Sequence, residues 1–138
     1  MSYLVVGGAG FIGSHLVDYF IDHHADKVVI LDSMSLGNID NISKAMDSGK
    51  VVLYREDARS LSAVESIIEK EKPTIVYNLA TKPLPYGFLD PMGAYMCSVE
   101  IASNLVTMLK RRMYSKLIHY SSSEAYGTAK YVPMDENH

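Results

Sequence analysis

Four glycines stand close together near the start of the chain, at Gly7, Gly8, Gly10 and Gly13. Their spacing satisfies both Gly-x-Gly-x-x-Gly and Gly-x-x-Gly-x-x-Gly, and they separate a short apolar run from a helical pattern. In that setting glycine permits a tight turn, lets the backbone approach a pyrophosphate, and packs the helix closely on the strand. The alternative is a tight turn that binds nothing. The pattern alone is weak, so its meaning depends on a partner further along the chain.

Asp32 is that partner, because it ends a second apolar run and lies 19 positions beyond Gly13. A carboxylate at this place accepts hydrogen bonds from the 2′- and 3′-hydroxyls of a ribose and repels a 2′-phosphate. The alternative is a turn residue at the end of a strand. Glycines, strand, helix and acid together predict a dinucleotide site that takes NAD rather than NADP.

Hydroxyl side chains occupy three successive positions, 121, 122 and 123, directly after an apolar run. A hydroxyl at the carboxyl end of a parallel strand faces the crevice of the sheet and could orient a substrate oxygen. The residues alone leave open an ordinary turn with hydroxyl–backbone hydrogen bonds.

Tyr126 and Lys130 spell Tyr-x-x-x-Lys, which in working enzymes sets phenol and ammonium on one face of a helix so that the cation lowers the tyrosine pKa. Here Gly127 weakens any helix and Pro133 follows closely. We predict that this pair is not catalytic.

Strands and helices alternate regularly along the chain, and no internal repeat or low-complexity linker interrupts them. Apolar runs predict strands at residues 3–6, 28–31, 51–54, 74–77 and 116–120. Helical spacing predicts helices at residues 11–23, from Leu61 to a stop at Pro73, and at 91–113 after an Asp90 cap. Residues 33–47 are predicted to hold a loop and a short helix, and residues 82–91 a loop. The predicted fold is α/β, a doubly wound parallel Rossmann sheet of strand order 3-2-1-4-5.

Composition indicates one globular domain, with 138 residues, 48% hydrophobic and 21% charged. A net charge of -3 with scattered cations argues against nucleic acid as a partner. Cys97 is the single cysteine, which fits a reducing compartment. Because no basic leader and no apolar run of about 20 residues is present, a cytoplasmic protein without a membrane partner is expected.

Histidines do not have the spacing of a metal site, so no metal is predicted. Those concerned are His15 on the first helix, His23 and His24 at its end, His119 in a strand and His138.

Four segments in order make the chain resemble the extended short-chain dehydrogenase/reductases, and within these the NAD-dependent epimerase/dehydratase family that modifies nucleotide sugars. They are GGAGFIGSHL at 7–16, LDSMSLGN at 31–38, NLA at 78–80 and SSSEAYG at 121–127. The resemblance covers essentially all 138 residues. It is specific for the family but not for the individual reaction.

The resemblance implies a cofactor site along the ends of the first four strands. It places Asp32 and residues 35–38 around the adenosine ribose, and Asp57 opposite the adenine amino group. From the residues alone, Asp57 could instead be a cap before a helix. The implied NAD-binding residues are Gly7, Gly10, Phe11, Ile12, Gly13, Asp32, Ser35, Gly37, Asn38, Asp57, Ala58, Leu79, Ala80 and Thr81.

The resemblance also implies catalytic positions at Ser122, which would hydrogen-bond the reacting sugar hydroxyl, and at Ser123 and Glu124, where some members carry acid/base groups. Ser98-Val99 departs from the Asn-Val common in the family. The family's catalytic Tyr-x-x-x-Lys lies further downstream than His138. We therefore expect residues 1–138 to be an NAD-binding domain whose C-terminal substrate lobe is absent and which alone turns over no substrate.

The predicted function is that of the NAD-binding portion of a nucleotide-sugar epimerase or dehydratase, acting through transient oxidation of the sugar. A homodimer through the helix at 91–113 is expected, since this helix often takes part in dimerisation in the family. The alternative is a sensor or scaffold module that binds NAD without chemistry. An NADP-dependent reductase is disfavoured by Asp32.

Overall fold

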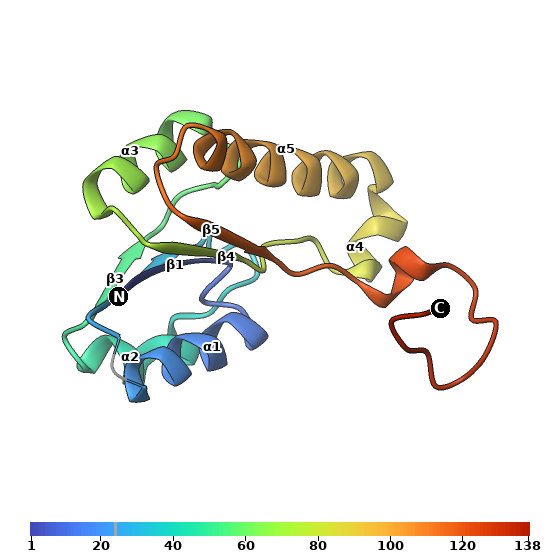
Figure 1. Cartoon of the computed structure of the whole chain (residues 1–138), viewed down its shortest axis with the longest axis horizontal. Coiled ribbons are helices and arrows are strands. Elements are labelled where there is room, and N and C mark those ends of the chain that lie inside the picture. Colours follow the sequence, from blue (N-terminus) through green and yellow to red (C-terminus); the bar gives the residue numbers. More distant parts are fainter. Residues whose placement is uncertain (24) are drawn as a thin grey trace.

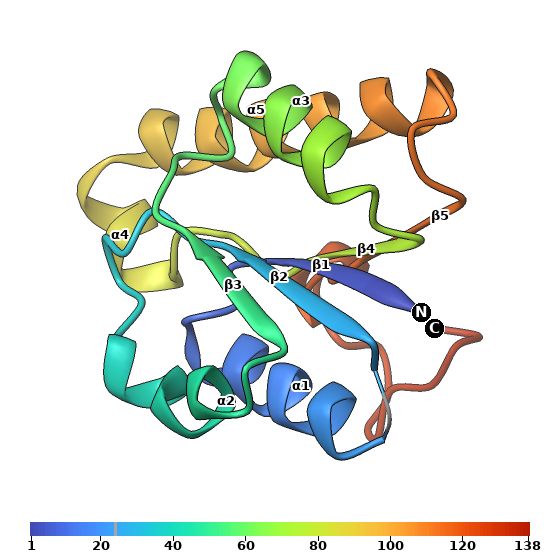
Figure 2. The ribbon, with the colours of Figure 1, turned by 90° about the vertical axis from the view of Figure 1, so that its left-hand side faces the viewer.

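The computed structural model describes residues 1–23 and 25–138, and shows a five-stranded parallel sheet between two layers of helices (Figures 1 and 2). The strands lie in the order β3-β2-β1-β4-β5, as predicted. Their bounds are β1 (Ser2–Val6), β2 (Lys27–Leu31), β3 (Val51–Tyr54), β4 (Ile75–Asn78) and β5 (Lys116–His119). Val6 is in register with Leu31 and with Asn78, so β1, β2 and β4 end side by side.

Helices cover the two faces of the sheet in pairs, with α3 and α5 on one face and α1 and α2 on the other (Figure 2). The helix bounds are α1 (Phe11–Asp22), α2 (Ser43–Asp47), α3 (Leu61–Glu71), α4 (Leu84–Leu89) and α5 (Pro91–Lys110), with short 3₁₀ turns η1 (Ile39–Ile42) and η2 (Ser123–Tyr126). His24, predicted to end the first helix, lies outside the described residues.

Alternate residues of the central strands build two separate cores. On β1, Leu4 and Val6 pack toward α3 and α5, whereas Val5 packs toward α1. All three are at most 1% exposed. Burial on both faces explains why the strands read as continuous apolar runs, and it makes the sheet a rigid base for the loops at its carboxyl ends.

The prediction that residues 82–91 form a loop is wrong, because α4 occupies Leu84–Leu89. Pro83 takes the N-cap position and Pro85 falls in the first turn. The N–H groups of a first turn have no acceptor inside the helix, so proline costs little there. These prolines begin a helix rather than exclude one.

Helix α5 begins as predicted and ends earlier than predicted. The Asp90 side chain accepts a hydrogen bond from the Gly93 N–H at 2.9 Å, and Pro91 is the first helical residue. The helix ends at Lys110 instead of about residue 113, since Arg112 adopts a left-handed φ of 60°.

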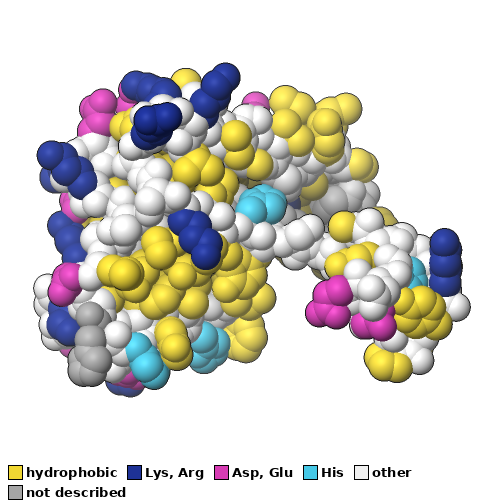
Figure 3. Space-filling view, viewed as in Figure 1, with side chains coloured by type: hydrophobic (Ala, Val, Ile, Leu, Met, Phe, Trp, Pro, Cys, Tyr) yellow, Lys and Arg dark blue, Asp and Glu magenta, His cyan; other side chains and the backbone are white. Residues whose placement is uncertain are grey.

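After β5 the chain leaves the sheet as an arm that includes η2 and is exposed along almost all of its length (Figures 1 and 3). None of the helices within the described residues is both long enough and apolar enough to cross a membrane.

Candidate functional site

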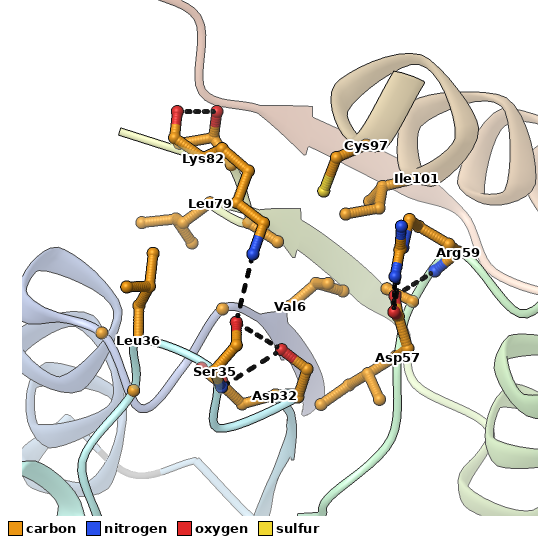
Figure 4. Close-up of a pocket in the computed structure, with 18 of the residues that line it drawn as sticks. Val6, Asp32, Ser35, Leu36, Asp57, Arg59, Leu79, Lys82, Cys97 and Ile101 are labelled. Atoms are coloured by element: carbon orange, nitrogen blue, oxygen red, sulfur yellow. Dashed lines mark hydrogen bonds and ion pairs between the residues drawn. The ribbon is translucent and has the colours of Figure 1, made fainter. Parts of the chain in front are cut away.

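A cleft opens at the carboxyl ends of β1 to β4, where the strand order reverses (Figure 4). This is the place where doubly wound sheets bind ligands. Predicted cofactor residues that line the cleft are Gly7, Gly10, Asp32, Ser35, Gly37, Asp57, Ala58, Leu79, Ala80 and Thr81. The fold therefore brings most of the predicted set into one cavity.

Two glycines of the turn have no room for a side chain. Gly7 has a φ of +80°, and a Cβ there would lie 2.8 Å from the Ala80 nitrogen. A Cβ on Gly13 would lie 2.2 Å from the Gly7 carbonyl oxygen, because α1 packs directly on the end of β1. Such a cradle brings bare backbone against the cleft, which is what close approach to a pyrophosphate requires.

Phe11 and Ile12 begin α1 just after this turn, and both side chains are exposed rather than part of the cleft wall. Gly10 occupies the N-cap position in an extended conformation. The first N–H groups of a helix have no acceptor within it and attract anions. Neither Phe11 nor Ile12 lines the cleft, whereas their backbone N–H groups belong to this first turn.

Asp32 is held by two backbone hydrogen bonds at the end of β2. Its Oδ2 accepts from the Ala9 N–H and its Oδ1 from the Met34 N–H, both at 2.9 Å. The residue is 8% exposed and lines the cleft. Because each carboxylate oxygen can accept two hydrogen bonds, both keep capacity for hydroxyl donors of a ligand.

The loop after Asp32 is hydrogen-bonded to the glycine turn. The Ala9 carbonyl accepts from the Asn38 N–H at 3.1 Å and from Asn41 Nδ2 at 2.9 Å. Asn38 does not line the cleft; its side chain caps η1 by accepting from the Asp40 N–H at 3.0 Å. Asn38 therefore supports the turn, while Ser35 and Gly37 face the cavity.

Asp57 lies at the end of the cleft formed by the loop after β3 (Figure 4). It is not the cap of α3, since Ser60 takes that position and accepts from the Ala63 N–H. The side chain of Arg59 donates to Asp57 and holds the pKa of that carboxyl below its ordinary value. An ion pair therefore lies at this end of the cleft, and its hydrogen bonds orient the Asp57 carboxylate.

The β4 end forms the opposite wall. Asn78 is 1% exposed, and its Oδ1 accepts from the Ala80 N–H at 3.2 Å, which sets the course of Leu79 to Thr81. Lys82 follows and reaches across the cleft, with Nζ 3.5 Å from the Ser35 Oγ (Figure 4). Its Nζ also lies 4.8 Å from the ring centroid of Tyr86 on α4.

Several residues of this cleft were not predicted from the sequence, above all Lys82, Arg59, Cys97 and Ile101. Lys82 directly follows the predicted strand-end segment, and Arg59 stands two positions after Asp57, so extending each motif by one or two residues would have found them. Cys97 and Ile101 come from the helix pattern of α5 and carry no such signal.

Ser122, Ser123 and Glu124 lie on the exposed arm and not in the cleft. Ser122 caps η2 by accepting a hydrogen bond from the Glu124 N–H at 3.2 Å. This is the turn with a hydroxyl–backbone hydrogen bond that the sequence left open as an alternative. Tyr126 ends η2, and Gly127 with a φ of 74° separates it from Lys130. Tyr126 and Lys130 therefore do not share a helix face.

His15 is exposed on α1 and its ring lies edge-on to Phe11, with centroids 5.1 Å apart. Among residues 1–23 and 25–138, no three His, Cys, Asp or Glu side chains are grouped so that they could hold a metal ion.

Fold and cleft together define a doubly wound domain of the Rossmann class, with a crowded glycine turn after β1 and an acid at the end of β2. A family model described as GDP-mannose 4,6 dehydratase matches residues 4–138. The chain belongs to the NAD-dependent epimerase/dehydratase family.

Similar proteins carry out different reactions. A Methanocaldococcus jannaschii protein, provisionally named UDP-glucose 4-epimerase, is 34% identical over 98% of this chain and 43% of its own length. UDP-glucuronic acid decarboxylase 5 of Arabidopsis thaliana is 30% identical over all of this chain and 38% of its own length. The UDP-glucose 4-epimerase of Bifidobacterium longum, solved with NAD+ and UDP, superposes with a TM-score of 0.89 at 25% identity, covering 99% of this chain and 41% of that one. The chain thus spans about two fifths of the proteins it matches.

Proposed function

We propose that this chain binds NAD across the carboxyl ends of β1 to β4, as the dinucleotide-binding domain of a nucleotide-sugar epimerase or dehydratase. The observation that carries the proposal is the 2.9 Å hydrogen bond from the Ala9 N–H to Asp32 Oδ2. It joins the glycine turn and the acid into one rigid unit, as a ligand with a pyrophosphate next to a ribose requires. The B. longum neighbour, solved with NAD+, supports the same reading.

Individual residues have distinct roles in this proposal. The backbone of Gly7 and Gly10 and the first turn of α1 would receive the pyrophosphate. Asp32 would accept the ribose hydroxyls, with Ser35 and Gly37 beside them. The adenine would lie against Asp57 and Ala58, and the rest of the cofactor along residues 79–81.

Lys82 adds the cation that the glycine turn lacks. The pyrophosphate is anionic, and the acids Asp32 and Asp57 in the same cleft disfavour further negative charge. The Lys82 Nζ, which reaches from the β4 loop to Ser35, is placed to offset that charge. We propose that it closes the cleft over the bound dinucleotide.

When bound, NAD would supply an acceptor for hydride from a sugar carbon and a donor for its return. Ser122 would hydrogen-bond the reacting hydroxyl, and Ser123 and Glu124 would provide polar or acid/base groups. These three residues must lie near the sugar to act, so the arm that carries them would move toward the cleft. The choice between epimerisation, elimination and decarboxylation belongs to the whole protein.

We also propose that the 138 residues form one domain and that the sugar-nucleotide lobe lies outside them, so that the chain alone turns over no substrate. The partial coverage of the relatives supports this. A cytoplasmic location, without nucleic acid or membrane partners, fits the net charge of -3 and the single buried cysteine Cys97.

A homodimer through α5 is a further part of the proposal. Exposed apolar side chains at Met92, Tyr95, Met96, Val99 and Val106 recur at helical spacing along this helix. Figure 3 shows hydrophobic atoms over the end of α5 near α4. A stripe of this kind suits an isologous contact with a second copy of the same helix.

A sensor or scaffold that binds NAD without chemistry is the second candidate. One observation favours it, namely that Ser122, Ser123 and Glu124 lie on the exposed arm and away from the cleft. Turnover of UDP-glucose by a whole protein that contains this chain would exclude it. A whole protein that binds NAD and converts no UDP- or dTDP-sugar would support it.

The cofactor proposal is tested by calorimetric titration of the chain with NAD and NADP. We expect NAD to bind and NADP to bind at least about tenfold more weakly, since Asp32 repels a 2′-phosphate. Asp32→Asn should weaken NAD binding and reduce the difference in affinity between NAD and NADP. Asp40→Asn, at an exposed position, should change neither quantity. Equal affinity of the unmodified chain for both dinucleotides, or binding of neither, would contradict the proposal.

A further inference from the structure

Arg59 donates hydrogen bonds to Asp57, two residues before it, from both its backbone and its side chain. Asp57 Oδ1 accepts from the Arg59 backbone N–H at 2.9 Å. Asp57 Oδ2 accepts from the Arg59 side chain twice, from Nε at 2.9 Å and from the terminal nitrogen Nη2 at 2.6 Å. One residue therefore supplies three donors to one carboxylate.

The backbone of this pair is anchored to α5. Asn104 on α5 donates through Nδ2 to the Ala58 carbonyl at 2.9 Å and to the Arg59 carbonyl at 2.8 Å. The loop after β3 is thereby attached to α5 next to Asp57. Asp57 is fixed by its hydrogen bonds to Arg59, and the main chain that carries them is fixed by Asn104.

The pair stands at the end of an apolar slot (Figure 4). Val6 and Leu31 from the ends of β1 and β2 line it, with Ala58 on the β3 side and Ile101 on α5. An apolar slot with polar groups at one end fits a flat heteroaromatic ring whose edge carries a hydrogen-bonding substituent. The substituent would meet Asp57.

The remaining acceptor capacity of Asp57 is small. A carboxylate offers about four lone-pair sites. Two donors fill Oδ2 and one donor occupies Oδ1, so one site on Oδ1 remains. A single N–H satisfies that site, whereas a carbonyl oxygen placed there would face a lone pair and a negative charge.

We propose that Arg59 is a positioning residue that sets base specificity, because it locks Asp57 as a one-site acceptor for an exocyclic amine of a bound dinucleotide. The inference rests on the proposed function, since it assumes that the adenine end of the cofactor occupies this slot. Without the Arg59 side chain, only the backbone N–H of residue 59 still donates to the carboxylate. The carboxylate can then rotate, so it would hold an amine less well and turn away from a carbonyl.

The alternative is an ordinary surface ion pair, since the side chains of Arg59 and Asp57 are 48% and 40% exposed. Exposed pairs contribute little to stability. If the pair were only that, removing it would leave the discrimination between bases unchanged. The ratio of the affinities for two dinucleotides with different bases therefore distinguishes a positioning role from a surface ion pair.

The test is calorimetric titration of the 138-residue chain with NAD and with nicotinamide hypoxanthine dinucleotide, in which a carbonyl replaces the adenine amine. The variants are Arg59→Leu and Arg59→Lys, which keeps the charge but loses the fork. Arg55→Leu is the matched control, because Arg55 is exposed on the same loop and does not line the cleft. Thermal unfolding of each variant checks that the fold is kept.

We expect the unmodified chain to prefer the adenine dinucleotide by roughly tenfold or more, the usual size for a hydrogen bond to a charged group. Arg59→Leu should reduce the preference to within about threefold, with Arg59→Lys between them and Arg55→Leu unchanged. A preference retained by Arg59→Leu, or absent from the unmodified chain that binds NAD, overturns the inference alone. Binding of neither dinucleotide by the unmodified chain overturns the proposed function instead.

A second measurement needs no ligand. Carbon NMR titration of the Asp57 carboxyl in the free chain should give a pKa below the ordinary value, because Arg59 donates to it. The pKa should rise in Arg59→Leu and stay low in Arg55→Leu. An Asp57 pKa that is the same with and without the Arg59 side chain would overturn the positioning role.

Discussion

Single residues determine how closely the backbone can approach a ligand in this cleft. Gly7 and Gly49 both have a left-handed backbone, with φ of +80° and +70°. Only Gly7 is crowded: an added Cβ would lie 2.8 Å from the Ala80 nitrogen, whereas a Cβ on Gly49 would meet nothing within 4 Å. The two positions therefore separate backbone strain from steric collision.

Gly7→Ala should lower the free energy of unfolding by about 3 kcal/mol, since it adds a collision with backbone to the strain of a left-handed alanine. Gly49→Ala should lower it by only about 1 kcal/mol, which is the strain alone. Urea denaturation of both variants measures the difference. Equal losses would show that the end of β4 yields to a side chain at position 7.

Asp32 is a polar residue whose position, but not whose hydrogen bonding, could be predicted. Its place at the end of β2 could be predicted from the spacing to the glycines, but its hydrogen bond to the Ala9 N–H could not. That bond depends on how the turn and the strand end lie against each other in space. The residue type was readable from the sequence, and the orientation was not.

At the scale of elements, one carboxylate ties α3 to two strands. Glu71, the last residue of α3, forms an ion pair with Lys27 of β2 and accepts from the Tyr54 hydroxyl of β3 at 2.6 Å. Its side chain is 4% exposed. Hydrogen bonds from Lys27 and then from Tyr54 lower the pKa of Glu71 from its ordinary value.

A lowered pKa in the folded state means that the charged form stabilises the fold. This contribution is complete above the ordinary carboxyl pKa and is lost as the pH falls through the lower folded value. We expect the free energy of unfolding to decrease on acidification in that range, and Glu71→Gln to flatten the decrease. Chemical denaturation across acidic pH measures it.

Glu69→Gln is the matched control, because Glu69 is exposed on the same helix. It should leave the pH profile as it is. At neutral pH, Glu71→Gln should cost about 1 to 2 kcal/mol, since Lys27 and Tyr54 lose a charged acceptor. A profile that is identical in the two variants would remove Glu71 from the acid response.

At the scale of the whole molecule, the apolar surface is distributed unevenly. The sheet packs its central strands on both faces, whereas α5 keeps an exposed stripe from Met92 to Val106. Tyr95 in this stripe is 62% exposed, and Tyr19 on α1 is 54% exposed. Tyr19 therefore serves as the control for Tyr95, because it is a similarly exposed tyrosine outside the stripe.

Tyr95→Glu should shift the chain from dimer to monomer, because a charge in the centre of an isologous contact meets its own copy. Tyr19→Glu should leave the dimer intact. Analytical ultracentrifugation over a range of concentrations measures both. A monomeric unmodified chain, or a dimer that survives Tyr95→Glu, would contradict the proposed contact.

The sequence by itself determined the strands, the order of the sheet and, in the glycines and Asp32, two parts of the cleft, whereas its other predicted residues came from the family resemblance. Apolar runs and helical spacing are local patterns, and parallel strands with short connections leave few arrangements. Local patterns did not predict α4, where prolines begin a helix instead of breaking one.

Only the tertiary structure decided which side chains meet across the cleft. Lys82 reaches Ser35, Asn41 holds the Ala9 carbonyl, and Asn104 holds the loop of Arg59. These partners are 32 to 47 positions apart in the chain. Such contacts follow from how packed elements align in space, and no local pattern in the sequence encodes that alignment.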